Sequence, residues 1–240
     1  MMGHSHSLSG AVVWLGVAPG LAALPAAIAP ELAPVTANVL SPTELIAGAL
    51  VCAGAAMLPD LDHPSATIAQ TFGPVTHWLS KAVNVVSGGH RHATHSLLFA
   101  IAMGLGTHFL ADNYPIGRDI VVVLMIGLAL RAIGIGVPGK TLTSAVVNIF
   151  LTAGVFTTFH LLGVQYAWLG VAIAVGCLTH VVGDCLTEHG CPVLWPIKGR
   201  WVLPYKIGFK TGKAFEQKVL APALSLAVVA LLCLRLMPAV

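Results

Sequence analysis

The chain has 240 residues, of which 57% are hydrophobic and only 9% are charged, and its formal net charge is +3. A soluble domain carries roughly 25% charged residues, so this composition excludes a soluble globular domain, a disordered chain and a coiled coil. It predicts an all-α, polytopic membrane protein, in which 11 histidines, more than the nine acidic residues, need a separate explanation.

Seven apolar stretches approach the length of about 20 residues that crosses the hydrocarbon core of a bilayer. In chain order they cover residues 8–29, 43–58, 96–111, 119–137, 143–163, 166–183 and 218–237. Pro19 and Pro25 predict that the first stretch is kinked or broken. It follows His4 and His6 rather than a basic segment, which favours a retained helix over a cleaved signal peptide. We expect residues 1–240 to form a single membrane-embedded domain.

Two segments between these stretches have the pattern of membrane-surface elements. In residues 74–87, apolar side chains recur at helical spacing, which predicts an amphipathic helix at the membrane surface or packed on the bundle. These side chains are Val75, Trp78, Leu79, Ala82, Val83 and Val86. Residues 198–215 interleave Lys and Arg with four aromatic residues, Trp201, Tyr205, Phe209 and Phe215. This second segment suits contact with anionic lipid, and the alternative is a flap that binds phosphate over a site.

The distribution of Lys and Arg predicts the orientation in the membrane. Six of the chain's 12 cations lie between the sixth and seventh stretches, namely Lys198, Arg200, Lys206, Lys210, Lys213 and Lys218. The positive-inside rule makes this segment cytoplasmic, and alternation then places the N-terminus and the loops 59–95 and 138–142 on the same side. Those loops add Lys81, Arg91 and Lys140, whereas Arg118 and Arg235 lie opposite. Arg131, inside an apolar stretch, is expected to extend toward the cytoplasmic face.

Most histidines and several acids fall at this same predicted face. The candidate metal ligands are His6, Asp60, Asp62, His90, His95, His180 and Asp184. His180 and Asp184 are four residues apart, so a helix presents both on one face. Imidazole and carboxylate together are typical ligands of zinc, manganese or non-haem iron. Seven candidates exceed what one tetrahedral zinc needs, so we expect one to three divalent ions, most simply zinc.

The remaining histidines and the cysteines are assigned less specific roles. His108 and His160 lie within apolar helices and are expected to be packing or interfacial residues, and His77 is expected to be solvated. Cys185 and Cys191 are weak ligand candidates, and the odd total of five cysteines argues against a disulfide framework. The roles of three further histidines stay open, namely His63, His92 and His189.

At these motifs the chain resembles the YdjM-like inner-membrane proteins, a family described as membrane-bound metal-dependent hydrolases. The resemblance is carried by His6 and by five ordered blocks: Leu58-Pro-Asp-Leu-Asp-His-Pro64, His90-Arg-His-Ala-Thr-His-Ser-Leu97, His180-Val-Val-Gly-Asp184, Gly190-Cys-Pro-Val-Leu-Trp-Pro196 and Thr211-Gly-Lys-Ala-Phe-Glu216. The last block resembles the family's Thr-Gly-Ser-x-x-Glu. His92 stands where the family usually has Gly, and Lys213 where it usually has Ser, which puts the details of both loops in question.

The resemblance implies a protein of the bacterial inner membrane and adds a distant similarity to the zinc-dependent phospholipase C and P1 nuclease fold. That similarity implies phosphoester hydrolysis and a ligand set consisting of His6, Asp60, His95, His180 and Asp184. Being an analogy at the level of the fold, it establishes no reaction by itself. Glu216, which ends the last family block, is assigned to the catalytic residues with Asp62 and Arg91.

The sequence therefore favours a metal-dependent phosphoesterase that acts on a phospholipid or another amphiphilic phosphodiester, with membrane lipid and no nucleic acid as its partner. Asp62 is a candidate general base or a further ligand. Arg91, with Lys206 or Lys210, is a candidate phosphate ligand. One alternative is a non-catalytic metal-binding protein, such as a sensor or scaffold. A cation transporter is disfavoured because ionisable residues near mid-membrane are nearly absent.

Overall fold

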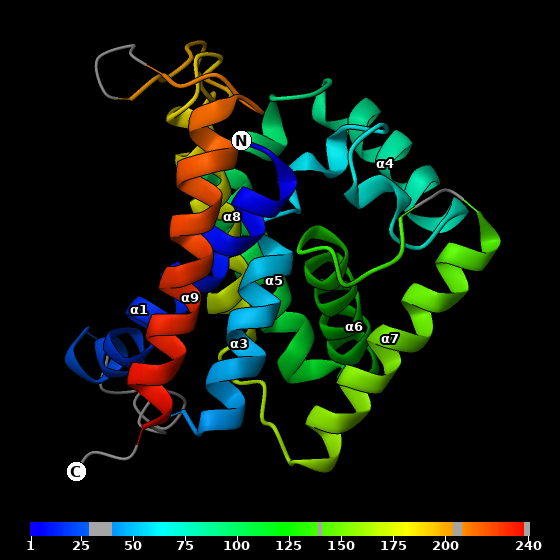
Figure 1. Ribbon diagram of the computed structural model, residues 1–240, viewed down its shortest axis with the longest axis vertical. Coiled ribbons are helices and arrows are strands. Elements are labelled where there is room, and N and C mark those ends of the chain that lie inside the picture. Colours follow the sequence, from blue (N-terminus) through cyan, green and yellow to red (C-terminus); the bar gives the residue numbers. More distant parts are fainter. Residues whose placement is uncertain (29–39, 139–140, 204–207, 238–240) are drawn as a thin grey trace.

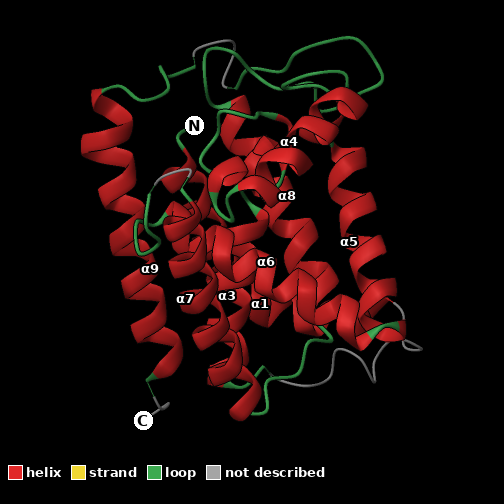
Figure 2. Cartoon of the chain, turned by 90° about the vertical axis from the view of Figure 1, so that its right-hand side faces the viewer, coloured by secondary structure: helices red, strands yellow, loops and turns green. Residues whose placement is uncertain are grey.

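The computed structural model describes residues 1–28, 40–138, 141–203 and 208–237, and these residues form a helical bundle (Figure 1). Its eight described α-helices are α1 Gly3–Ile28, α3 Pro42–Ala55, α4 Pro74–Ser87, α5 Leu97–Asn113, α6 Pro115–Ala132, α7 Leu142–Leu161, α8 Leu169–Cys185 and α9 Ala221–Leu236. Shorter turns are η2 Pro59–Asp62, η3 Ile68–Gln70, η4 Ala93–His95 and the π-helical η5 Glu216–Leu220. The all-α prediction is confirmed, and red helices account for most of Figure 2.

The helix termini follow the capping signals of the sequence. At the start of α3, the Ser41 hydroxyl accepts a hydrogen bond from the Glu44 amide, and the Glu44 carboxylate accepts one from the Ser41 amide at 2.8 Å. This reciprocal pair is a capping box. The Ser96 hydroxyl caps α5 by accepting from Phe99 N at 3.1 Å. Because Ser96 directly follows His95, this cap holds His95 immediately outside the start of α5.

Helix α3 occupies the centre of the bundle, where it packs against α1, α6 and α8. Small residues allow this close approach. A Cβ atom on Gly54 would lie 2.0 Å from the Met125 carbonyl oxygen of α6, and one on Gly176 of α8 would lie 2.5 Å from the Cβ of Ala55. The close contact between α3 and α8 brings the two C-terminal ends together, and both ends carry candidate ligands.

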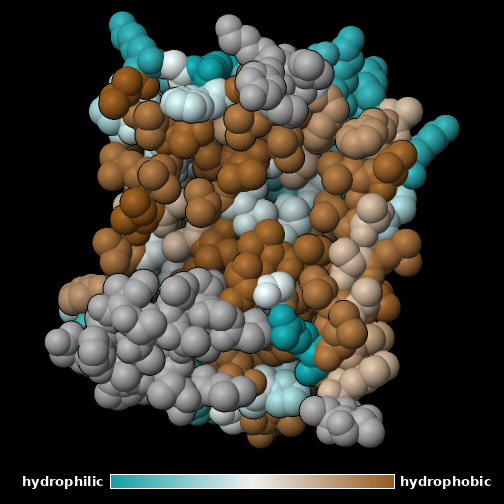
Figure 3. Space-filling view, turned by 90° about the vertical axis from the view of Figure 1, so that its left-hand side faces the viewer, coloured by the Kyte–Doolittle hydropathy of each residue, from teal (hydrophilic) through white to brown (hydrophobic). Residues whose placement is uncertain are grey.

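The outer surface of the bundle is apolar, as expected for a membrane protein. Three segments are long and apolar enough to span a bilayer, namely Pro42–Asp62, Leu142–Leu161 and Glu216–Leu236. Helices α5 and α8 are apolar but shorter. The face in Figure 3 shows a broad band of hydrophobic side chains below a rim with hydrophilic ones. Each of the seven predicted stretches overlaps a helix. The first stretch forms one continuous helix, α1, as far as Ile28, so the prediction of a break is wrong, and that of a kink stays a prediction.

The N-terminus and the last turn of α9 lie at opposite ends of the bundle (Figure 1). Helices α1 and α5 begin at the end that holds the N-terminus, and α3 and α8 finish there. The motifs that the sequence assigned to one face of the membrane therefore do share one end of the molecule. That this end faces the cytoplasm stays a prediction from the Lys and Arg distribution.

The amphipathic helix predicted at residues 74–87 is confirmed as α4, with the same bounds. Its polarity is the reverse of that of a surface helix in a soluble protein. Val75, Trp78 and Val86 are exposed, Val86 to 88%, whereas Thr76 and Ser80 are buried against η2 and η3. An apolar outward face suits the boundary between headgroups and acyl chains. Helix α4 packs against η2, which carries Asp60 and Asp62, so it lies at the end of the bundle that carries the polar motifs.

Candidate metal centre

Five side chains from four segments converge at the N-terminal end of the bundle. His6 comes from the first turns of α1, Asp60 from η2 after α3, His95 from η4 before α5, and His180 and Asp184 from the last turns of α8. His6, His95, His180 and Asp184 are almost completely buried. The sequence placed all five among the ligand candidates.

Four donor atoms at the centre of this cluster are separated by 3.3–3.8 Å in five of their six pairs. His95 Nε2 lies 3.3 Å from His180 Nε2, 3.5 Å from Asp60 Oδ1 and 3.7 Å from Asp184 Oδ2. His180 Nε2 lies 3.7 Å from Asp60 Oδ1 and 3.8 Å from Asp184 Oδ2. Zinc bonds of about 2.0–2.1 Å give a tetrahedron with edges of about 3.3–3.4 Å. His95, His180 and Asp184 offer one ligand atom each within 4.8 Å of one another, and so do His6, Asp60 and His180. Among the described residues, each of these sets of three has the spacing of metal ligands.

Hydrogen bonds orient both histidine rings toward this centre. His180 Nδ1 lies 2.7 Å from the carbonyl oxygen of Ala56. A carbonyl only accepts, so Nδ1 carries the proton and Nε2 presents a lone pair to the cluster. His95 Nδ1 lies 3.2 Å from Asp62 Oδ2. A carboxylate behind the ring is the usual partner of a metal-binding histidine.

His6 supplies the clearest test of whether a metal ion fits. Its ring stacks on that of His180 with centroids 3.7 Å apart, and its Nε2 lies 3.2 Å from Asp184 Oδ1. His6 Nδ1 has no hydrogen-bond partner within the described part of the chain. Buried polar atoms without partners are unfavourable. His6 also offers a ligand atom within 4.8 Å of those of Asp60 and His180. A divalent cation bound there would supply the missing partner, so the donor set fits a metal.

Asp62 lies beside the centre and is surrounded by donors. Its Oδ1 is 2.7 Å from His90 Nδ1, and its Oδ2 accepts hydrogen bonds from the Thr94 hydroxyl and from Arg91 N at 3.1 Å. Asp60, Asp62, His90 and His95 also offer one ligand atom each within 4.8 Å of one another. This arrangement allows a second ion, and it equally suits Asp62 as a residue that positions His90 and His95.

Arg91 directs a positive charge at the cluster from a left-handed backbone conformation. Its φ is 59°, which costs a non-glycine residue about 1–3 kcal/mol. Nη2 lies 2.9 Å from Asp184 Oδ2, and Nη1 donates to the Gly190 carbonyl at 3.1 Å. The side chain is 12% exposed. These bonds hold the strained residue in place beside the cluster.

Glu216 is not brought into the cluster. It is buried, and its two carboxylate oxygens accept hydrogen bonds from the Met2 amide at 2.6 Å and the Gly212 amide at 2.7 Å. These bonds fasten the loop before η5 to the start of the chain, so the geometry gives Glu216 a structural role. Lys206 and Tyr205 lie outside the described residues, and Lys210 is exposed.

Several contributors were not identified from the sequence. Thr94 lies inside the block from His90 to Leu97, but a hydroxyl next to a histidine does not by itself indicate a functional residue. The Ala56 carbonyl and the Asn84 side chain, which donates to the Asp62 carbonyl, have no sequence signature. Among the thiols, Cys191 Sγ donates to the His95 carbonyl at 3.0 Å. The His63 ring contacts the His90 ring edge-on at 4.7 Å.

Binding of a divalent ion should release a proton from His95. Burial by itself lowers the pKa of His95, but its hydrogen bonds to Asp60 and Asp62 outweigh burial and raise the pKa to about 9. The ring is therefore protonated at pH 7.5, and a cation must displace that proton. Apparent metal affinity should rise as the pH increases toward 9. Calorimetric titration of the metal-free protein in two buffers of different ionisation enthalpy measures this proton. Equal heats in the two buffers would show that metal binding releases no proton.

Known proteins similar to this chain come from the inner membrane of bacteria. A family model described as YdjM inner membrane protein matches residues 1–137 and 138–239. The Inner membrane protein YdjM of Escherichia coli (strain K12) is 28% identical over 148 residues, which cover 62% of this chain and 48% of the relative. The protein of the same name from Shigella flexneri gives the same values. The match thus spans about half the length of these curated relatives. No solved structure matches the chain, so the distant similarity to phospholipase C and P1 nuclease stays a prediction.

Proposed function

Because this chain belongs to the YdjM inner membrane protein family, we propose that it is a membrane-embedded, metal-dependent hydrolase of phosphoesters. Its substrate would be a phospholipid or another amphiphilic phosphodiester at the cytoplasmic face of the inner membrane. The observation that carries this proposal is the convergence of four donor atoms from Asp60, His95, His180 and Asp184 beside the Arg91 guanidinium group.

The metal would be held by Asp60, His95, His180 and Asp184, with His6 next to them. Zinc is the simplest choice for two imidazoles and two carboxylates, and manganese or iron is compatible. When bound, such an ion lowers the pKa of a water ligand toward neutrality and polarises a phosphoryl oxygen. A second ion would be held by a neighbouring set of ligand atoms, from Asp60, Asp62, His90 and His95.

The chain's own residues would bind the phosphate and move protons. The planar Arg91 guanidinium group matches two phosphate oxygens at once, and it already lies 2.9 Å from a carboxylate oxygen of the cluster. His90 is about one-third exposed, and its Nδ1 is held by Asp62 at 2.7 Å. A carboxylate that fixes one imidazole nitrogen leaves the other available for proton transfer. We therefore assign proton transfer to His90 Nε2, with Asp62 as its positioning residue.

Removal of the metal tests this proposal directly. Chelation should lower hydrolysis of a soluble phosphodiester reporter at least about 100-fold, since the ion would supply several kcal/mol of transition-state stabilisation. Added zinc or manganese should restore the rate, and metal analysis should follow the activity. Undiminished turnover in Asp60→Ala or His180→Ala would contradict the proposal. His108→Ala is the matched control, because His108 is exposed on α5 and contacts only Asp112 among the charged residues described.

A non-catalytic metal-binding protein is the second candidate. The almost complete burial of His6, His95 and His180 is also the environment of a structural metal site. Under that alternative, metal removal would lower the melting temperature, and no phosphodiester would be cleaved at any metal content. The reporter assay and the melting temperature together separate the two functions.

A further inference from the structure

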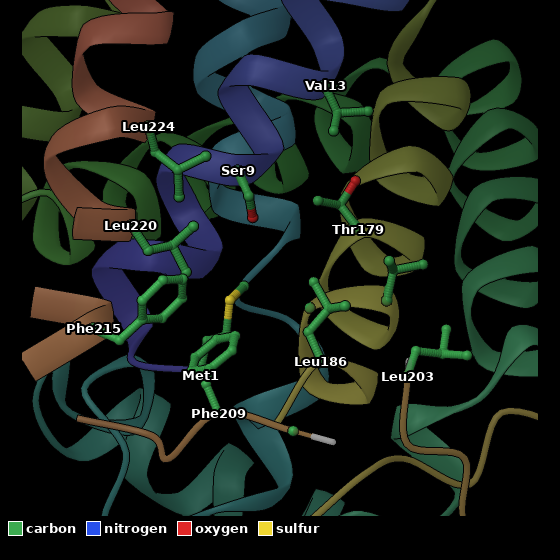
Figure 4. A pocket seen from close by; sticks show the side chains of 13 residues that line it. Met1, Ser9, Val13, Thr179, Leu186, Leu203, Phe209, Phe215, Leu220 and Leu224 are labelled. Carbon is green, nitrogen blue, oxygen red and sulfur yellow. The ribbon is translucent and has the colours of Figure 1, made fainter. Parts of the chain in front are cut away.

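An apolar groove opens on one side of the bundle, between α1, α8 and α9 (Figure 4). Its volume is about 610 Å³, which is within the usual range for a bound small molecule. Val13 comes from α1, Leu186 from the end of α8 and Leu224 from α9, and Phe209 and Phe215 line the end near the N-terminus. None of the candidate metal ligands is among the residues that line the groove.

The polar groups on the groove wall are already satisfied. The Ser9 hydroxyl donates to the His6 carbonyl at 2.8 Å, and the Thr179 hydroxyl donates to the Val175 carbonyl at 2.7 Å. Both bonds stay within their own helices. The wall therefore presents hydrocarbon, and a polar ligand would lose its hydrogen bonds to water without compensation. An alkyl chain loses none.

The groove reaches the back of the metal cluster. Gly183 lies on the wall between His180 and Asp184 in sequence, and a Cβ atom there would lie 3.2 Å from His6 Nδ1. Met1 also lines the groove, and its amino nitrogen lies 2.6 Å from Asp184 Oδ1. A molecule whose tail fills the groove would therefore have its other end beside the proposed metal ligands.

The surroundings of the groove indicate the class of occupant. One wall belongs to Glu216–Leu236, which is apolar and long enough to span a membrane. Its Leu226 is 71% exposed, so this segment faces lipid when the protein is in a bilayer. At the polar end, the exposed cations Lys210 and Lys213 lie next to the aromatic lining residues in sequence. Apolar walls along the groove and cations at its polar end match a lipid with an anionic headgroup.

We propose that this groove binds a hydrocarbon chain of a membrane lipid whose phosphate lies at the metal centre. The inference rests on the proposed function, because it names the lipid chain as the part of the substrate that this groove recognises. It makes chain length, and not only the phosphodiester bond, a determinant of specificity.

A photoreactive lipid tests where the chain binds. The probe is phosphatidylglycerol with a diazirine near the end of one acyl chain, in vesicles that contain the 240-residue protein. We expect crosslinks on α1, α8 and α9 at the residues that line the groove. Leu224→Trp should lower these crosslinks at least about tenfold, since the ring would displace roughly two methylene groups of the chain. Leu226→Trp, on the exposed face of α9, should leave them unchanged.

Activity separates this inference from the proposed function. Leu224→Trp should raise KM for the long-chain lipid and leave hydrolysis of a soluble bis(p-nitrophenyl) phosphate reporter unchanged. Val13→Trp on the opposite wall should do the same, and an unchanged metal content verifies that both variants fold. Equal crosslinking in Leu224→Trp and Leu226→Trp would contradict binding of the lipid chain in the groove. Crosslinks confined to the groove without hydrolysis of either substrate would support lipid binding and overturn the proposed function.

Discussion

Replacement of His180 by Ala should lower the metal content of the purified protein to less than about a tenth of the wild-type value. Even outer-shell partners of a metal site contribute about 10–100-fold to affinity, and His180 is expected to bind directly. Its Nε2 is within 3.8 Å of three other donors, and its Nδ1 is fixed by the Ala56 carbonyl. Elemental analysis per chain measures the effect. The same metal content in both proteins would place the site elsewhere.

The loss of metal must be distinguished from unfolding. His180 also fills space against His6, so its truncation removes packing as well as a ligand. His108→Ala removes an exposed imidazole from α5 and should keep the full metal content. His95→Ala, which removes a donor from a different segment, should reproduce the loss of metal. Matching melting temperatures of the metal-free forms would show that the ligands, and not the fold, determine the metal content.

Arg91 should be the residue whose replacement lowers catalysis most while leaving the metal in place. Loss of its guanidinium group should lower turnover of the phosphodiester reporter by about 10²–10³-fold, the usual effect of removing one preorganised donor from a charged transition state. Arg91→Lys should recover little, because a single ammonium cannot replace a planar pair of donors. Steady-state kinetics together with metal analysis measure both properties.

Arg91→Gly best separates the role of the Arg91 side chain from that of its backbone conformation. With φ at 59°, the backbone of Arg91 is in a region that glycine adopts without strain. The variant should therefore lose catalysis without losing backbone stability. Lys81→Gly would be a poor control because Lys81 lies inside α4, so Lys81→Ala serves instead, as it removes an exposed cation that lies over Trp78. Normal turnover in Arg91→Gly would exclude Arg91 from phosphate binding.

The helices and the location of the site were predictable because they depend on patterns that a sequence displays directly. The spacing of apolar residues gave the bounds of α4. The clustering of acids and histidines beside apolar stretches placed the candidate ligands at one end of the bundle, as observed for Asp60, His95 and Asp184. The break that Pro19 and Pro25 allow is absent from α1, which continues to Ile28, because a proline removes only one hydrogen bond and can bend a helix without ending it.

The assignment of roles within the site depends on three-dimensional contacts, which the spacing of residues along the sequence does not determine. Asp62 and Asp60 are two residues apart and look equivalent in the sequence. Only the structure shows Asp62 enclosed by donors from His90 and Thr94, while Asp60 faces the central donor atoms. Glu216 looked catalytic because it ends a family motif, yet its carboxylate binds backbone amides. The apolar groove is formed by helices that are distant in sequence, so it too could not be predicted.

The inverted polarity of α4 has a consequence for how a lipid would reach the site. The apolar face of α4 sets the depth at which this helix rests in the bilayer, and its Asn84 side chain is bonded to the backbone of Asp62. If α4 lies at the membrane interface as proposed, the proposed metal ligands would be held at the same level, which is the level of the phosphates of the surrounding lipids. A lipid would then enter by lateral diffusion within its own leaflet, and the energetic barrier of extracting it from the membrane would not arise.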